Sequence, residues 1–241
     1  EDTVIHAFIH TSKGHWNLGH IPLLPATGNF SPEDYSSPFS HQNESAQPGY
    51  YQVYLERYGV NAELTSTLRC AFHKYTFKAG QSKKLIADLS RSNERVRSWE
   101  INQEGENVFK GFQQTGEKMY FYAVANHSIK NIEPQKSEKN EISIVNFVDS
   151  PKTLEIQIGF SFVSIANAKE NLEKEMLAKS FQQIRDEATK TWETLLAKIT
   201  VSGGTERQKG LFYSTLYRSF LWPALRSDIN GDFTDVKNEV V

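Results

Sequence analysis

The sequence predicts a mainly β protein, an antiparallel β-sandwich followed by two helices, and three observations support this fold class. Short segments in which apolar and polar residues alternate recur from residue 50 to residue 163. Turn-forming clusters of Gly, Asn, Lys and Pro separate these segments without an intervening helical pattern, which is typical of an antiparallel sandwich. From residue 167 onward the apolar residues are spaced by three and four positions, the period of an amphipathic helix.

The first 49 residues are rich in Gly, Pro, His, Ser and Asn, and we expect loops with brief strands, for example at residues 21–24. The first clear strand contains Tyr51, Val53 and Leu55, which occupy every second position as in a half-buried strand. A second strand is expected over residues 62–66, after a turn. Further strands are predicted at residues 71–77, 84–89, 95–101, 107–112, 119–125, 142–147 and 154–163.

One segment within the predicted sandwich does not follow the alternating pattern. Residues 130–140 are charged and contain Pro134, and proline removes a backbone donor that a strand needs. We therefore expect a solvated loop there.

A long amphipathic helix, broken at most once, is predicted for residues 167–198 because its apolar residues form one stripe. The stripe consists of Leu177, Phe181, Ile184, Ala188, Trp192, Leu195 and Ile199. The glycine-containing segment at residues 202–204 then interrupts the chain, so the helix is expected to end before it.

A second helix is predicted to begin after Thr205, because Gln208 three residues later completes a capping box. It should end before Pro223, since the residue preceding a proline disfavours helical geometry. A single helix cannot bury its own apolar face, and we expect an all-helical domain to follow Val241. The expected domains are a sandwich at 1–165, a helical linker at 166–204 and the start of a helical domain at 205–241.

Composition excludes some classes of protein. The formal net charge of −2 argues against a nucleic-acid surface, which normally shows a clustered basic excess. No apolar run reaches the length of about 18 residues that a membrane span needs. The chain opens with Glu1 rather than Met, so we expect a piece of a longer protein and conclude nothing from the lack of a signal peptide. Cys70 is the single cysteine and lies in an apolar strand pattern, which predicts a buried thiol.

Two patterns raise the question of a metal site. His6, His10, His15 and His20 are closely spaced, as zinc ligands often are, but no cysteine or His-Glu-x-x-His helix accompanies them. Surface histidines, or loop contacts to a ligand, remain the alternatives. Residues 228–232 resemble the start of a calcium loop, but Phe233 occupies the position where such a loop needs glycine. We expect a plain turn there and assign no metal ligand.

Two loops have the composition of a sugar-binding site. Residues 40–51 place consecutive polar side chains before a Pro-Gly turn, which suits a neutral polyhydroxyl ligand. Trp16, next to His15, could stack on a sugar face, or it could cap the core of the sandwich. Glu44 is the one carboxylate with neighbours of this kind, and one carboxylate does not make an acid/base pair. We therefore assign no catalytic residue to this chain.

Five parts of the chain, in order, resemble glycoside hydrolase family 92, the calcium-dependent exo-α-mannosidases of mainly bacterial origin. These parts are Phe8–Thr11 with Leu18–Ile21, Ser40–Tyr51, Ala62–Thr65 with Phe72–Phe77, Gly159–Ser164 with Ala168–Leu172, and Ser202–Thr205 with Phe212–Ser219. The resemblance implies a β-sandwich of the supersandwich type packed on an (α/α)6 barrel, with the active site between them. The chain would then end near the first barrel helix.

The resemblance also implies a mechanism and a site. A Glu acid and an Asp-type base hydrolyse terminal α-mannosides with inversion, and calcium holds vicinal mannose hydroxyls. Because these acids and most calcium ligands belong to the barrel, this chain is expected to supply one wall of the substrate cleft. The residues expected in that wall are His10, Thr11, His15, Trp16, His41, Asn43 and Glu44.

The implied whole protein is an exo-α-mannosidase, expected to be of the α-1,2 type, that acts on N-glycans or mannan. Secretion, or a periplasmic or cell-surface location in a bacterium, goes with such substrates. Residues 12–20 depart from the family pattern in the part expected to shape the leaving-group subsite, so the linkage preference stays open. Two alternatives remain: a non-catalytic carbohydrate-binding or interaction module, and an enzyme for another sugar.

Overall fold

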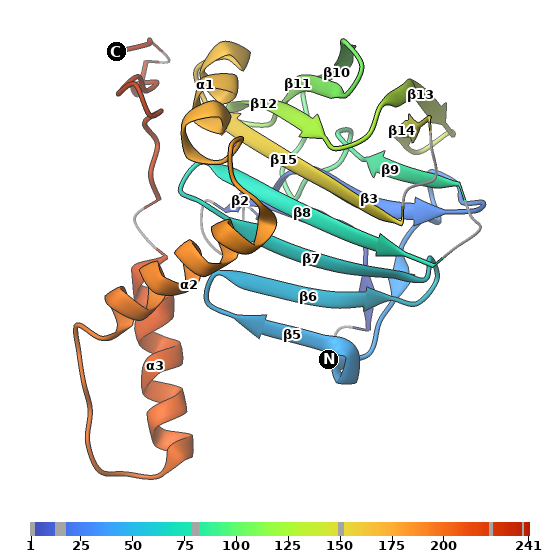
Figure 1. Cartoon of the computed structure of the whole chain (residues 1–241). Helices are drawn as coiled ribbons and strands as arrows, with labels where there is room; N and C mark the ends of the chain where they lie inside the picture. The colour runs from blue at the N-terminus through green and yellow to red at the C-terminus, as the bar shows by residue number, and fades with distance from the viewer. Residues whose placement is uncertain (1–2, 13–17, 79–81, 149–151, 222–223, 238) are drawn as a thin grey trace.

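The computed structural model describes residues 3–12, 18–78, 82–148, 152–221, 224–237 and 239–241, with the backbone alone at residues 11, 12 and 18. In this part of the chain two antiparallel sheets pack face to face, and helices lie against the outer face of the larger sheet (Figure 1). The mainly β sandwich predicted from the sequence is therefore confirmed.

The larger sheet has eight strands in the order β10-β11-β12-β15-β8-β7-β6-β5. Their bounds are β5 Glu44–Gln47, β6 Tyr50–Leu55, β7 Val60–Ser66, β8 Cys70–Phe77, β10 Ser98–Glu104, β11 Val108–Gln114, β12 Lys118–Ala125 and β15 Thr153–Ser161. A short 3-10 helix, η1 (His41–Asn43), precedes the edge strand β5. Each sequence-neighbouring pair from β5 to β8 is a simple hairpin, so the register follows from short turns.

The smaller sheet has five strands in the order β13-β14-β9-β3-β2. Their bounds are β2 Phe8–Ser12, β3 Leu18–Thr27, β9 Lys83–Ala87, β13 Ile129–Lys136 and β14 Glu141–Phe147. The short strands β1 (Val4–Ile5) and β4 (Ser37–Pro38) pair with each other. β3 is much longer than the brief strand expected at residues 21–24, because it pairs with β2 on one side and β9 on the other.

The solvated loop expected at residues 130–140 is wrong for most of its length. Residues 129–136 form β13, which pairs with β14 from Ile129 to Lys136 with one register shift between Ile129 and Asn131. β13 is the edge strand of its sheet, and an edge strand tolerates Pro134 because one side of the strand has no ladder to complete. The charged residues that suggested a loop belong to this exposed edge, where they also discourage pairing with other chains.

The core fills the space between the inner faces of the sheets. Tyr75, Phe109 and Phe121 are among the largest side chains with almost no exposed surface. Each such apolar burial stabilises the fold by about 1.5–3 kcal/mol. A second cluster lies on the outer face of the larger sheet, where Phe72 and Phe181 meet under the helices. β8 is therefore buried on both faces over much of its length.

Helices α1 (Ile165–Glu175) and α2 (Phe181–Leu196) confirm the long helix with one interruption. Two glycines let them approach the sheet closely. A Cβ on Gly159 would lie 2.1 Å from the carbonyl oxygen of Ala168 in α1, and a Cβ on Gly49 would lie 2.9 Å from Ala188 in α2. α3 (Glu206–Phe220) begins at the capping box of Thr205, as predicted.

The segment that resembled a calcium loop fastens the chain after α3 to the sandwich. The buried Asp228 carboxylate accepts hydrogen bonds from Ser161 Oγ at 2.6 Å and from Asn171 Nδ2 at 2.7 Å. The Ile229 amide donates to Asn171 Oδ1 at 2.8 Å, and Gly231 closes a turn onto Asp228. Asp228 is thus an anchor between β15, α1 and the C-terminal segment.

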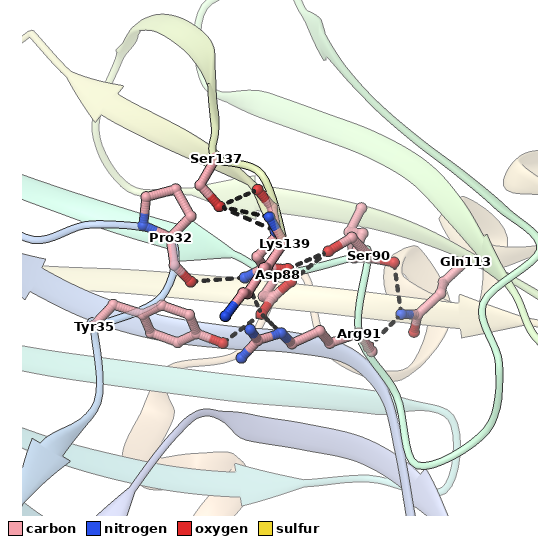
Figure 2. A network of polar contacts seen from close by, with 10 residues as sticks. Pro32, Tyr35, Asp88, Ser90, Arg91, Gln113, Ser137 and Lys139 are labelled. Carbon is pink, nitrogen blue, oxygen red and sulfur yellow. Dashed lines mark hydrogen bonds and ion pairs between the residues drawn. The ribbon is translucent and has the colours of Figure 1, made fainter.

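A second polar network lies inside the sandwich (Figure 2). The Asp88 carboxylate, 1% exposed, accepts hydrogen bonds from Tyr35, from Ser90 at 3.0 Å and from Asn140 at 3.4 Å. Gln113 donates to the carbonyl oxygens of Leu89 and Arg91 at 2.8 Å. Every one of these polar groups has a protein partner. The network therefore has a structural role: it holds the chain that follows β9 against both sheets.

Candidate functional site

A cleft of about 490 Å³ opens where the rim of the sandwich faces α2, α3 and the chain after α3. We call it the sheet–helix cleft. Its sandwich wall comes from β2, the ends of β5 to β8, and β15, and its helical wall contains Trp192, Tyr217 and Leu221. The wall residues include Gln47, Tyr50, Thr65, Arg69, Phe162, Arg226 and Asp228.

Aromatic side chains of both walls are held in fixed positions. The ring centroids of Trp192 and Tyr217 are 4.6 Å apart, and burial raises the pKa of the Tyr217 hydroxyl. On the sandwich wall, the Arg185 guanidinium lies 3.7 Å from the ring centroid of Tyr50. Burial and then the hydrogen bond to Glu63 raise the pKa of Tyr50 to about 12. Both tyrosines therefore keep their protons. The Tyr50 hydroxyl is bonded to Gln52 and Glu63 and offers a ligand its ring, whereas the Tyr217 hydroxyl can donate to a neutral ligand.

Arg69 ties three segments together at the base of the cleft. Its Nη1 lies 2.6 Å from Glu175 Oε1, and its Nε donates to the Ser227 carbonyl oxygen at 2.8 Å. The other Glu175 oxygen accepts from Thr67 Oγ1 at 2.5 Å and from the Arg69 amide at 3.1 Å. The turn between β7 and β8 is thus fixed against the end of α1. The positive charge of Arg69 is neutralised by this pairing, which suits a cleft for an uncharged ligand.

His10 lies at the inner end of the cleft and is 6% exposed. Its ring stacks on His73 with centroids 4.9 Å apart, and it contacts Phe160 at 4.8 Å. Burial lowers the pKa of His10 to about 4, against the opposing effect of its hydrogen bonds to the backbone of Ile21 and His20. Burial, and then the neighbouring His10, also hold the pKa of His73 well below its ordinary value.

The hydrogen bonds of this pair fix both protonation states. His10 Nδ1 is 2.8 Å from the Ile21 carbonyl oxygen, which can only accept, so Nδ1 carries the proton. His10 Nε2 must then accept from His73 Nε2 at 2.9 Å, and His73 Nδ1 must accept from the Tyr75 hydroxyl at 2.5 Å. Both imidazoles are neutral, and both nitrogens of His10 are already bonded. His10 therefore contributes shape to the cleft rather than a hydrogen bond to a ligand.

The same contact holds a strained backbone position. Ile21 has a φ of 52°, which is rare for a β-branched residue. Its carbonyl is bound by His10, and its amide donates to Gln113 Oε1 at 2.7 Å. Such a conformation persists only where the surroundings impose it, and here partners from both sheets do so.

The structure separates the predicted site residues into two places. His41, Asn43 and Glu44 lie at the start of β5, whereas the cleft meets β5 at its other end, at Gln47. Glu44 accepts from Tyr51 at 2.7 Å and lies 2.5 Å from His41 Nδ1. The Tyr51 bond and then the His41 bond lower the pKa of Glu44.

The remaining predicted residues are only partly described. His15 and Trp16 lie outside the described residues, and for Thr11 the backbone alone is placed, in β2 next to His10. Tyr51 lines the sheet–helix cleft while its hydroxyl binds Glu44, so it connects the two places.

Sequence reasoning missed several residues of the cleft. Trp192 belonged to an apolar helical stripe, and nothing in that stripe distinguishes a core residue from one that faces a cleft. Arg69 is 106 residues from Glu175 and 158 from Ser227, so its role has no local signal. Tyr50 follows the Pro-Gly turn directly, and its place beside a loop of polar residues was the one signal available.

Three further features of the described residues bear on function. Among the described residues, no group of three or more His, Cys, Asp or Glu side chains has the arrangement to hold a metal ion. None of the described helices is both long and apolar enough to cross a membrane. Cys70 is buried, and burial raises the pKa of its thiol, which confirms the predicted buried thiol.

Two family models match the chain. The model of the glycosyl hydrolase family 92 N-terminal domain matches residues 1–175, and the model of the family 92 catalytic domain matches residues 167–241. No curated protein matches the chain significantly.

The solved structures with a similar fold are described as family GH92 enzymes. A family GH92 α-mannosidase from Bacteroides thetaiotaomicron matches with a TM-score of 0.85 and 22% identity, over 93% of this chain and 35% of that one. The family GH92 glycosyl hydrolase ccman5 matches with 0.86 and 22%, over 99% and 37%. An inverting mannosidase from Bacteroides thetaiotaomicron VPI-5482 matches with 0.80 and 23%, over 91% and 33%. The chain thus spans about a third of the length of these proteins.

Proposed function

Because the chain belongs to glycosyl hydrolase family 92, we propose that the protein containing it is an exo-acting α-mannosidase. In this proposal the enzyme removes terminal α-mannosyl units with inversion, and this chain forms one wall of the substrate cleft. α-1,2-linked mannosides of N-glycans or mannan are the proposed substrates. A secreted, periplasmic or cell-surface location in a bacterium is proposed because such glycans lie outside the cell.

The observation that carries the proposal is the composition of the sheet–helix cleft. It lies between the sandwich and the segment matched by the catalytic-domain model. Aromatic rings and polar groups line it, and its cationic members Arg69 and Arg226 are each paired with an acid. Rings accept the C–H face of a sugar while hydroxyls and amides bind its hydroxyl groups. A solved α-mannosidase of similar fold was captured with mannoimidazole, and another is named an inverting mannosidase, which supports the substrate and stereochemistry proposed.

The chain's own residues would bind and position the substrate rather than cleave it. Tyr50, Trp192 and Tyr217 line the cleft, and the His10–His73 contact fixes strand β2. Thr11, His15 and Trp16 stay proposed contacts to the sugar. In an inverting enzyme the acid and base stand roughly 6.5–9.5 Å apart to admit water, and we expect both in the remainder of the catalytic domain.

Calcium is also assigned to the remainder of the protein. The described residues do not fit a calcium site, since no group of three or more His, Cys, Asp or Glu side chains among them has the arrangement to hold a metal ion. When bound, calcium would supply coordination of vicinal mannose hydroxyls, and no step on this chain depends on it.

The test is hydrolysis by the full-length protein on a panel of α-linked mannobioses, with calcium and with a chelator. Mannose release that a chelator abolishes is the expected result, with the α-1,2 isomer cleaved fastest. Binding of mannobiose without release of mannose would instead favour the non-catalytic carbohydrate-binding module. Release of a different sugar from a wider glycoside panel would contradict the assignment to α-mannosides.

A further inference from the structure

The polar residues of the η1–β5 region border a second, open hollow on the larger sheet, separate from the sheet–helix cleft. We call it the amide hollow. It is lined by Gln42, Asn43, Glu44, Ser45, Gln52, Tyr54 and Asn61. Its lining combines four side-chain amides, the Ser45 hydroxyl and the Tyr54 ring with its hydroxyl, together with one carboxylate, Glu44.

Two of the amides are held in fixed orientations. The single Tyr50 hydroxyl proton is shared between Gln52 Oε1 at 2.7 Å and Glu63 Oε1 at 3.0 Å, and the shorter bond turns the Gln52 Nε2 toward Asn61. That Nε2 donates to Asn61 Oδ1 at 3.1 Å, so the Asn61 amide nitrogen is the end of the chain of bonds. Tyr50 itself is anchored by Glu63 at 3.0 Å and by the Arg185 guanidinium over its ring. The Asn61 donor is therefore ordered before any ligand arrives, which lowers the entropic cost of binding.

An aromatic ring stands directly beside this donor. Tyr54 and Asn61 are opposite residues on β6 and β7, so their side chains share one face of the sheet. The Lys78 ammonium lies 5.5 Å from the centroid of the Tyr54 ring, and the ring is partly exposed at the hollow. An ordered ring flanked by amide donors is the arrangement that binds one sugar unit by stacking and hydrogen bonding.

The charges of the hollow indicate a neutral ligand. Glu44 is its one acid, and its two oxygens are engaged by Tyr51 and His41. The remaining lining groups carry no charge, and the Lys78 ammonium over the Tyr54 ring is the one cation named beside them. A neutral glycan has the required chemistry.

The amide hollow and the sheet–helix cleft lie at opposite ends of one hairpin. β5 runs from Glu44, which lines the hollow, to Gln47, which lines the cleft. The turn between β5 and β6 lies beside α2 (Figure 1), and Gly49 in this turn is close to Ala188 of α2. A sugar in the hollow would leave the cleft open. We propose that the amide hollow is a secondary glycan-binding site, which holds a mannan chain while its end is processed elsewhere.

The choice of mannan as the ligand rests on the proposed function. The test distinguishes a failure of the proposed binding site from a failure of the proposed hydrolytic activity. The full-length protein and its Tyr54→Ala and Asn61→Ala variants are run by affinity electrophoresis through gels containing α-mannan, and assayed on mannobiose. We expect about three- to tenfold weaker retention by mannan and unchanged mannobiose hydrolysis. Tyr54→Phe keeps the ring and should keep the retention.

The matched control is Tyr120→Ala, which removes another partly exposed tyrosine with a lysine over its ring, on β12 of the same sheet. It should leave mannan retention unchanged. Equal retention of the wild type and the Tyr54 and Asn61 variants would overturn the inference, and so would a parallel loss of mannobiose hydrolysis at unchanged melting temperature. Retention that depends on Tyr54 in a protein that cleaves no mannoside would support the hollow and refute the proposed function alone.

Discussion

The Nε2 atoms of His10 and His73 lie 2.9 Å apart and join the two sheets of the sandwich across their inner faces. A series of hydrogen bonds runs from the Ile21 carbonyl through His10 and His73 to the Tyr75 hydroxyl. Because the carbonyl can only accept, the position of every proton in this series is determined. This series of hydrogen bonds requires both imidazoles to be neutral. Its consequences can be measured even before any activity is assigned.

Acid should destabilise the protein through His10. Its pKa is about 4 in the folded state and 6.5 in the unfolded state, so between these values the unfolded state binds more protons. The free energy of unfolding should therefore fall as pH is lowered from 6.5 to about 4, by up to about 3 kcal/mol. His73 shifts in the same direction. Urea unfolding at several pH values measures this slope.

The control for the acid effect is His127→Gln, which changes a histidine outside the chain of bonds and should keep the wild-type slope. His10→Gln should flatten it. An equal slope in the wild type and in His10→Gln would contradict the role of the buried pair.

Removing the Tyr75 hydroxyl should cost more than one ordinary hydrogen bond. Tyr75→Phe leaves His73 Nδ1 buried without a donor, and a buried unsatisfied group costs about 1–3 kcal/mol. Tyr120→Phe, at a partly exposed site, is the comparison and should change the free energy of unfolding little. A loss below about 0.5 kcal/mol for Tyr75→Phe would argue against the assigned direction of the protons.

Gly49 should resist substitution for two reasons that can be separated. It has a φ of +85°, and an added Cβ would meet Ala188 of α2 at 2.9 Å. Gly105 has a similar φ of +63° but nothing within 4 Å of its Cβ position. Gly105→Ala thus measures backbone strain alone, and Gly49→Ala should be less stable by a further 1–3 kcal/mol or so. Equal losses in thermal or urea unfolding would show that α2 does not press on this turn.

Breaking the Arg69–Glu175 pair should destabilise the base of the cleft. Both side chains are largely buried, at 16% and 11% exposure, and Arg69→Met leaves Glu175 without its cation. We expect a loss of about 1–3 kcal/mol in unfolding experiments. Lys209→Met breaks a pair whose acid, Glu206, is 91% exposed, and it should have almost no effect. Similar losses for both variants would contradict the structural importance assigned to Arg69.

Trp192→Ala tests the cleft as a substrate site. Under the proposed function, the variant should lose about three- to tenfold in kcat/KM on mannobiose, because a ring that contacts the sugar is removed. Its melting temperature should change much less, since Trp192 is only partly buried. Full activity with a collapsed melting temperature would show that Trp192 serves packing between α2 and Tyr217 alone.

The sequence allowed the fold to be predicted wherever burial is one-sided. Val53 and Leu55 alternate with polar residues because one face of β6 meets the core, and the capping box at Thr205 needs only four neighbouring residues. β13 was missed because its pairing depends on β14 rather than on its own composition. The division into domains at residues 165 and 204 stays a prediction.

The candidate site was harder to predict because its groups meet only after folding. The polar run of residues 40–51 read as one binding loop, but pairing in a hairpin sends its two ends to different hollows. The role of His10 depended on His73, which lies 63 residues further along the chain. No local pattern reports such a contact.

The close approach of Gly49 to Ala188 also has a mechanical meaning. A Cβ added at Gly49 would meet Ala188 at 2.9 Å, so this turn acts as a stop that limits how closely α2 approaches the sheet. Trp192 lies four residues beyond this stop, about 6 Å along the helix axis, so a tilt of about 10° about it moves that part of the helix by about 1 Å. The minimum width of the cleft therefore depends on Gly49, which has only a hydrogen atom where any other residue would have a Cβ.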